Sequence, residues 1–199
     1  MKIVANVAEL EAVYGEAVGG SLTKVKPALT PQYRRWIEAA RFVVLTTVGP
    51  EGTDASPRGD AGPVARIVDD RTLMIPDWRG NNRMDSLRNI VRDGRVSLMF
   101  MVPGSNNVVR VNGLGVVTMD PSVTETFTQR DKHPRSVMVI TIEELYFQCA
   151  KALMRSELWN PDVAADVPSA GDFLKEVDAI EDATEYDARY ADYARPKMW

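Results

Sequence analysis

The chain of 199 residues contains one cysteine and one histidine, and both shortages exclude some kinds of chemistry. With Cys149 alone, no internal disulfide bond can form, which is typical of a protein from a reducing compartment. A metal site built on several histidines is excluded as well. His133 stands beside Pro134 in a predicted loop, where a solvated side chain is expected rather than the base of a Ser-His-Asp triad. We therefore predict neither a bound metal nor a His-dependent hydrolase.

Long apolar runs and long basic runs are also missing. No apolar run is long enough to cross a bilayer, and the first residues (MKIVANVAEL) lack the apolar core of a signal peptide. The formal net charge is −4, and no basic run offsets it, which argues against nucleic acid as the main partner. These absences predict a cytoplasmic protein that binds neither a membrane nor nucleic acid.

Two nucleotide-binding signatures are absent or incomplete. The sequence has no Walker GK[ST] motif, and Gly113-Leu114-Gly115 begins a dinucleotide fingerprint without its third glycine. A P-loop and a Rossmann fold are therefore not expected.

What is present is the composition of an ordinary globular domain, with 45% apolar and 26% charged residues. After a helical stretch over residues 1–40, β-branched and alternating segments separated by short turns predict antiparallel hairpins. Asn112-Gly113 is expected to form a bulge or bend within the fifth of these strands. Hairpins of this kind favour a barrel, so we predict a mainly β fold with flanking helices (α+β). The predicted strands cover residues 42–48, 64–68, 72–75, 95–102, 107–119 and 136–147.

The C-terminal quarter is predicted to be helical again. Lys151, Arg155 and Trp159 recur every four residues, so one helix face carries two cations and an aromatic ring, or is simply a snorkelling basic face. Residues 162–170 form a predicted linker. In the tail that follows, Tyr186, Tyr190 and Tyr193 form a stripe that we expect to dock on this chain or on a partner subunit. A ligand-binding role for the stripe is the alternative.

The most informative stretch is PDWRGNNRMDSLRN, residues 76–89, which joins a predicted strand to a helix expected over residues 82–93. A helix start exposes unpaired N–H groups and favours anions. Arg79 and Arg83 flank the turn, and Asn81 and Asn82 are suitable helix caps with amide donors. The turn suits a phosphate monoester; a capped surface helix with solvated arginines is the alternative.

Five segments occur in an order that resembles a known family. They are ASPRGD (55–60), DDRTLMIPD (69–77), GNNRMDSLRNI (80–90), RVNG (110–113) and CAKALMRSELW (149–159). Together they resemble the pyridoxamine 5′-phosphate oxidase-like flavoproteins of the FMN-binding split-barrel superfamily, and more narrowly a bacterial branch of it. The resemblance covers residues 41–159.

The resemblance implies a homodimer of six-stranded antiparallel split β-barrels, with FMN bound at each subunit interface. The barrel domain would span residues 41–160, with the helical segment 1–40 packed on it. Residues 161–199, a linker and a helix, would belong to the same domain.

The resemblance also implies the cofactor site. The phosphate would lie on Asn81, Asn82 and Arg83. The oxidases usually place two adjacent basic residues there, and because Asn82 replaces the first, Arg79 or the partner's helix would have to compensate. The remaining implied cofactor-binding residues are Ser56, Arg58, Asp60 and Arg66 near the flavin ring or ribityl chain, Pro76 and Asp77 along the flavin, and Lys151, Arg155 and Trp159 reaching the cofactor of the other subunit.

The implied activity is that of an FMN-dependent oxidoreductase, with hydride transfer to or from an unidentified small molecule. Such chemistry needs no nucleophile or general base from the protein, so we predict no catalytic residue. One alternative is a non-catalytic flavin-binding sensor or carrier. Another is a deazaflavin-dependent reductase, although such cofactors favour a basic groove. Haem binding would need His133 as axial ligand, and Gln148 replaces a histidine that is frequent in the branch.

Overall fold

One antiparallel sheet dominates the computed structural model, which describes residues 1–17, 19–163 and 166–199. Val18, in the predicted helical stretch, and Ala164 and Ala165, in the predicted linker, lie outside the described residues. The strands follow the order β2-β1-β5-β6-β7-β4-β3, and every neighbouring pair is antiparallel. The strands are β1 (Phe42–Gly49), β2 (Gly52–Gly59), β3 (Arg66–Ile67), β4 (Thr72–Asp77), β5 (Arg95–Met101), β6 (Val108–Thr118) and β7 (Ser136–Gln148).

The mainly β architecture with flanking helices is confirmed, but the prediction of six strands was wrong because the sheet has seven. The missed strand, β2, contains Asp54, Pro57 and two glycines, all residue types that are rare in strands. It pairs on one side only, with β1, in a register that sets Pro57 opposite Val44. An edge strand tolerates proline because one row of its N–H groups needs no partner.

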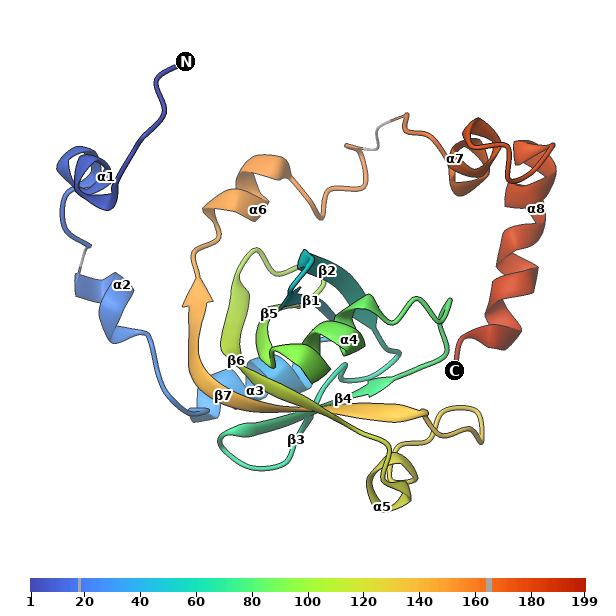
Figure 1. The fold of residues 1–199 in the computed structure, drawn as a ribbon, viewed down its shortest axis with the longest axis horizontal. Helices are drawn as coiled ribbons and strands as arrows, with labels where there is room; N and C mark the ends of the chain where they lie inside the picture. The colour runs from blue at the N-terminus through green and yellow to red at the C-terminus, as the bar shows by residue number, and fades with distance from the viewer. Residues whose placement is uncertain (18, 164–165) are drawn as a thin grey trace.

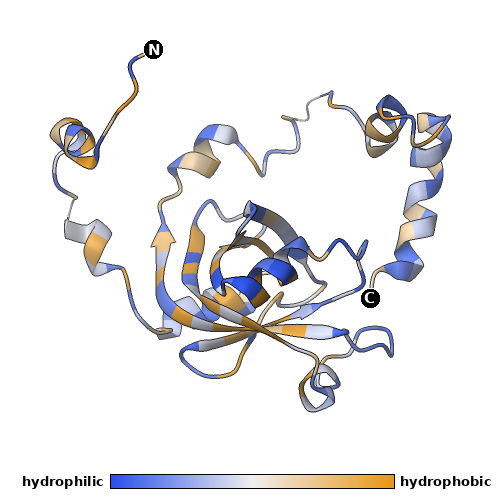
Figure 2. Cartoon of the chain, in the orientation of Figure 1, coloured by the Kyte–Doolittle hydropathy of each residue, from blue (hydrophilic) through white to orange (hydrophobic). Residues whose placement is uncertain are grey.

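The core lies inside the curve of the sheet, where alternate residues of β1, β5 and β7 point inward. Val43, Leu45, Leu98, Phe100 and Met138 are at most 1% exposed. Orange apolar residues recur between paler and blue ones along β6 and β7 in Figure 2. This pattern explains why the central strands could be predicted, since period-2 alternation is the signal of a half-buried strand.

The register between β6 and β7 shifts at Asn112-Gly113, where a bulge or bend was predicted, but the extra residue lies on β7. Asn112 pairs with Glu144 but Gly113 pairs with Ile142, so the β7 strand carries one extra residue at this point. A polar chain crosses three strands beside it: Ser97 Oγ donates to Asn112 Oδ1 at 2.7 Å, and Asn112 Nδ2 donates to Glu144 Oε1 at 2.7 Å. The bulge therefore fixes the register between the two longest strands.

Two helices, α3 and α4, pack on the sheet (Figure 1). Helices α1 and α2 form an arm on one side of it, α6, α7 and α8 form an arm on the other, and α5 lies in the connection between β6 and β7. Ile37 of α3 is fully buried, and α4 lies against β1, β2 and β6. Helices α1 and α2 contain no buried residue, and Ala183 is the buried residue of α8. No helix among the described residues combines the length and the hydropathy that a bilayer span requires. The helices are α1 (Val7–Tyr14), α2 (Gly19–Thr23), α3 (Pro31–Ala39), α4 (Asp85–Arg92), α5 (Pro121–Thr124), α6 (Lys151–Ser156), α7 (Ala170–Glu176) and α8 (Ala183–Ala194), followed by the 3₁₀ turn η1 (Arg195–Lys197).

Candidate functional site

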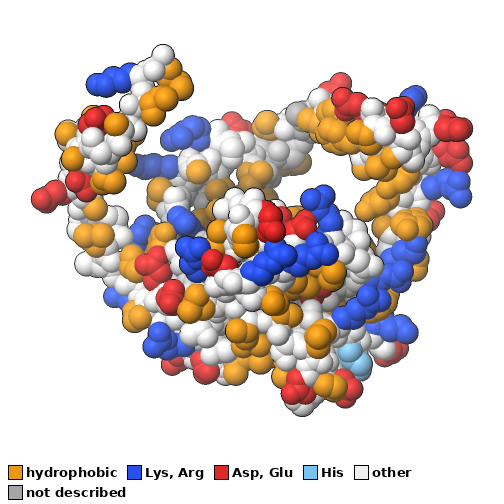
Figure 3. Space-filling view, viewed as in Figure 1, with side chains coloured by type: hydrophobic (Ala, Val, Ile, Leu, Met, Phe, Trp, Pro, Cys, Tyr) orange, Lys and Arg blue, Asp and Glu red, His pale blue; other side chains and the backbone are white. Residues whose placement is uncertain are grey.

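A cleft of about 620 Å³ opens between β2, the end of β4, the turn that leads into α4 and the last residue of the chain. Basic side chains gather over α4 and along the neighbouring C-terminal end of the chain in Figure 3. The structure thus brings together seven of the thirteen cofactor-binding residues predicted from the sequence. These seven are Ser56, Arg58, Asp77, Arg79, Asn81, Asn82 and Arg83.

The turn differs from the expected capped helix start. Helix α4 begins at Asp85 rather than near residue 82, because Asn82 and Met84 adopt positive φ angles of 61° and 60°. Asn81 Oδ1 accepts a hydrogen bond from the Arg83 N–H at 3.1 Å, within the turn instead of on the helix. The capping position falls on Met84, whose side chain makes no hydrogen bond to α4. The predicted asparagine caps are therefore wrong, and the first-turn N–H groups of α4 have no side-chain cap at the cleft.

Three carboxylates line the cleft, and each has a partner there. Asp77 accepts a hydrogen bond from Arg58 Nη1 at 2.5 Å, and both side chains are about three-quarters buried. Arg83 Nε donates to Asp85 Oδ2 at 2.6 Å, and this bond raises the pKa of Arg83. The third carboxylate, Asp54 on β2, accepts a hydrogen bond from Ser86 Oγ of α4 at 2.6 Å. Asp77 and Asp85 are thus paired with an arginine, whereas Asp54 is hydrogen-bonded to a neutral hydroxyl group.

Two arginines of the cleft have no ion pair among the described residues. Four arginines line the cleft, and no described carboxylate lies within ion-pairing distance of Arg79 or Arg135. Arg58 Nε is buried and has no hydrogen-bond partner among the described residues. A buried donor without a partner is costly unless a ligand supplies an acceptor. The cleft therefore suits an anion with several oxygen atoms.

Three predicted residues lie outside the cleft and hold the scaffold. Asp60 accepts a hydrogen bond from Trp78 Nε1 at 2.9 Å, so it fixes the indole of a cleft residue. Arg66 donates to Thr126 Oγ1 at 2.7 Å and lies 3.6 Å from the centre of the Phe127 ring. Pro76 is buried within β4. None of these three residues is among those that line the cleft.

The last three predicted residues belong to α6 and the segment after it. Lys151 and Arg155 are exposed, and Trp159 Nε1 donates to the main-chain oxygen of Ser105 at 2.8 Å. None of them lines the cleft of the same chain. Their contribution to a cofactor site in another subunit remains a prediction.

Arg135 and Trp199 are among the cleft residues that sequence reasoning missed. Arg135 follows a loop that contains the lone histidine, whose Nδ1 lies 2.8 Å from the main-chain oxygen of Phe127. Trp199 reaches the cleft from the far end of the chain. Neither residue sits in a motif, and only the tertiary fold brings them to the turn.

Comparisons with known proteins agree with this fold. A family model described as pyridoxamine 5′-phosphate oxidase matches residues 29–149. HupZ from Group A Streptococcus, in a variant form, is 17% identical with a TM-score of 0.50; the match covers 60% of this chain and 98% of that chain. A pyridoxamine 5′-phosphate oxidase-like protein from Lactobacillus delbrueckii is 22% identical with a TM-score of 0.49, covering 61% and 95%. An F420 reductase is 16% identical with a TM-score of 0.44, covering 60% and 98%.

Identities this low show a likeness of fold alone, and no curated protein matches the chain. The family model is stronger, because its match spans more than half of the chain, including all seven strands and the turn that lines the cleft. This chain belongs to the pyridoxamine 5′-phosphate oxidase family.

Proposed function

We propose that the protein is an FMN-dependent oxidoreductase that transfers a hydride to or from a small molecule. The observation that carries the proposal is the arginine-rich turn in front of the uncapped α4 start, in a chain of this family. The phosphate of FMN would lie against the first-turn N–H groups of α4 and the side chains of Asn81 and Arg83. Helix N-termini favour such anions through their N–H groups and their partial positive charge.

The residues present fit this cofactor. The cleft volume of about 620 Å³ lies within the ~300–1,000 Å³ range of sites that bury a drug-sized ligand. The unpartnered Arg58 Nε is a donor that an oxygen or nitrogen atom of the flavin could satisfy. The indole of Trp78, fixed by Asp60, supplies an apolar wall beside the charged turn.

The flavin would supply the hydride chemistry, and the chain would bind and orient it. In that role Arg79 and Arg83 hold the phosphate, and the Arg58–Asp77 pair fixes the polar floor of the cleft. We also propose that the sheet of each copy closes into a split barrel and that two copies form a homodimer. In this dimer Lys151, Arg155 and Trp159 of one copy would approach the cleft of the other. Light scattering of the purified protein should then report twice the 22.1 kDa chain mass.

The first experiment is an absorption spectrum of the purified protein, followed by chromatography of the ligand released on heating. FMN should be recovered or taken up on addition, with riboflavin bound more weakly because it lacks the phosphate. Reduction of the bound flavin by NADH or NADPH, and its reoxidation, would distinguish an enzyme from a carrier. A protein that takes up a deazaflavin but no FMN would contradict the cofactor assignment.

Arg83→Ala is expected to raise the FMN dissociation constant about tenfold, through the loss of one charge-assisted hydrogen bond to the phosphate. The loss also leaves Asp85 uncompensated beside the phosphate. The measurement is quenching of FMN fluorescence on titration with protein. Arg92→Ala is the matched control, because Arg92 lies at the other end of α4 and pairs with Glu51 on the surface. An unchanged constant for Arg83→Ala, or an equal change in riboflavin affinity, would remove Arg83 from the phosphate site.

A further inference from the structure

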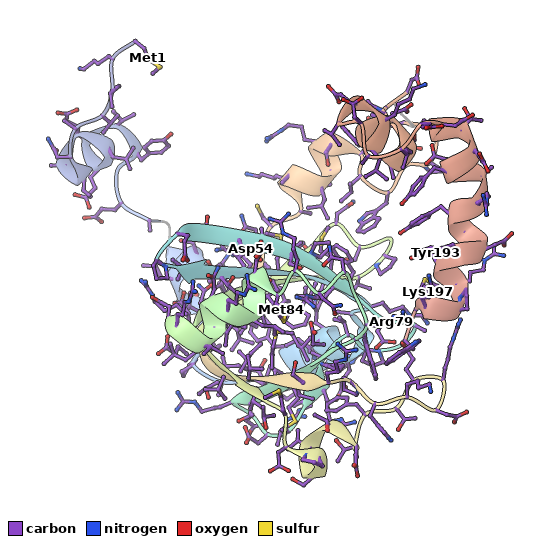
Figure 4. The ribbon with its side chains drawn as sticks, turned by 45° about the vertical axis from the view of Figure 1, so that its right-hand side comes forward. Met1, Asp54, Arg79, Met84, Tyr193 and Lys197 are labelled. Carbon is purple, nitrogen blue, oxygen red and sulfur yellow. The ribbon has the colours of Figure 1, made fainter. Side chains whose placement is uncertain are left out.

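One wall of the cleft comes from the opposite end of the chain. The Arg79 N–H donates a hydrogen bond to the main-chain oxygen of Trp199 at 2.6 Å. The Arg79 guanidinium lies 5.6 Å from the centre of the Trp199 ring, within the range of a cation–π contact. In Figure 4, Arg79 lies beside Tyr193 and Lys197 at the end of α8. The residue that flanks the anion-binding turn is therefore in contact with a segment beyond the family match, which ends at residue 149.

This segment, residues 195–199, is held by polar and cation–π contacts rather than by a hydrophobic interface. Arg130 Nη1 donates to the main-chain oxygen of Arg195, and the Lys197 ammonium lies 3.0 Å from the centre of the Tyr193 ring. Lys197 and, more weakly, Arg79 hold the pKa of the Tyr193 phenol below its ordinary value. Holding a chain end in one place costs conformational entropy, which its contacts have to offset. The contacts with Arg79 and Arg130 therefore hold residues 195–199 in position beside the cleft.

The contact of the Arg79 guanidinium with the Trp199 ring is not an ion pair. Arg58 and Arg83 both pair with a carboxylate, whereas Arg79 packs against an indole and has no described carboxylate within ion-pairing distance. An aromatic face orients a guanidinium without neutralising it. The ring contact therefore orients the Arg79 guanidinium without pairing it with a carboxylate.

We propose that Trp199 is a positioning residue of the anion site, which holds the Arg79 guanidinium toward the phosphate group of the ligand. With FMN as the ligand, the proposal rests on the proposed function. It adds a ligand-binding role for the C-terminal segment, which contributes one wall of the cleft.

The test is a double-mutant cycle read out as FMN and riboflavin affinity. Trp199→Ala should raise the FMN dissociation constant about three- to fivefold and leave that of riboflavin unchanged, while Trp199→Phe, which keeps an aromatic face, should stay within about twofold of wild type. Arg79→Ala should raise the constant about tenfold, and the double variant should be no worse than Arg79→Ala, because Trp199 acts through Arg79. Tyr190→Ala, on the same arm but outside this cleft, is the control. Additive losses, or equal losses for FMN and riboflavin, would overturn the positioning role.

A second measurement works without FMN. If the wild-type protein takes up no FMN, the proposed function fails, and the position of Trp199 is then judged by fluorescence quenching. The emission of Trp199, taken as the difference between wild type and Trp199→Phe, should be quenched more by iodide than by neutral acrylamide. This excess should disappear in Arg79→Ala, because the adjacent cation raises the local iodide concentration. The same iodide quenching in wild type and Arg79→Ala would overturn the inference.

Discussion

Gly113→Ala is expected to lower the free energy of unfolding by about 3 kcal/mol, the upper end of the cost of overpacking a well-packed site. A Cβ atom at Gly113 would lie 2.0 Å from the main-chain oxygen of Thr141 and 3.0 Å from its carbonyl carbon. It would also lie 3.3 Å from the Glu143 nitrogen. All three atoms belong to the backbone of β7, so no side chain can rotate away. The bulge between β6 and β7 would have to shift, and the Ser97–Asn112–Glu144 chain would shift with it.

Urea unfolding followed by circular dichroism measures the change in the free energy of unfolding. In a thermal melt, the melting temperature of Gly113→Ala should fall by roughly 6–12 °C. Gly62→Ala is the matched control, because nothing lies within 4 Å of a Cβ atom there and its φ angle is ordinary. This control should change the free energy of unfolding by less than about 0.5 kcal/mol. Equal unfolding midpoints for Gly113→Ala and Gly62→Ala would mean that β6 and β7 are not paired in this register.

The strands and the bulge were predictable where the signal is local. The strands β1, β5, β6 and β7 are rich in β-branched and other apolar residues, and residues on alternate sides of these strands are buried. Asn112-Gly113 marks the place where the register between β6 and β7 shifts. The edge strand β2 could not be predicted in this way. It is specified by pairing with β1, which overrides the poor strand propensity of Asp54 and Pro57.

The residues of the candidate site were likewise predictable only where they are close together in the sequence. Arg79 and Arg83 were predictable because they share one turn, whose composition is visible in seven consecutive residues. Trp199 and Arg135 were not, because the distance between two segments far apart in the sequence is set by the whole fold. Arg66 was expected near the flavin from the family resemblance, whereas the fold places its side chain against Thr126 and Phe127. The sequence alone does not show which residues a charged side chain will contact, because those residues come from elements that are distant in the sequence.

Arg58→Met is expected to raise the FMN dissociation constant about 10- to 100-fold, on the proposal that FMN occupies the cleft. One part is the loss of a charge-assisted hydrogen bond, worth about 1.5–3 kcal/mol. The other is electrostatic, because Asp77 would keep its negative charge, about three-quarters buried, beside an anionic ligand. Methionine preserves the apolar stem, so the packing on β2 should survive. The measurement is the FMN titration used for the other variants, with circular dichroism as the check on folding.

Asp77→Asn separates the two contributions. The double variant Arg58→Met/Asp77→Asn removes both charges of the pair and should recover about a tenth to a half of the lost binding free energy relative to Arg58→Met, because the repulsion of the phosphate is gone while the hydrogen bond remains missing. Asp77→Asn alone should bind FMN at least as tightly as wild type, since it leaves the Arg58 guanidinium free for the ligand. Wild-type affinity in Arg58→Met would remove Arg58 from the cofactor site. Equal affinities for Arg58→Met and the double variant would instead show that Asp77 does not oppose the ligand, and that Arg58 acts through its hydrogen bond alone.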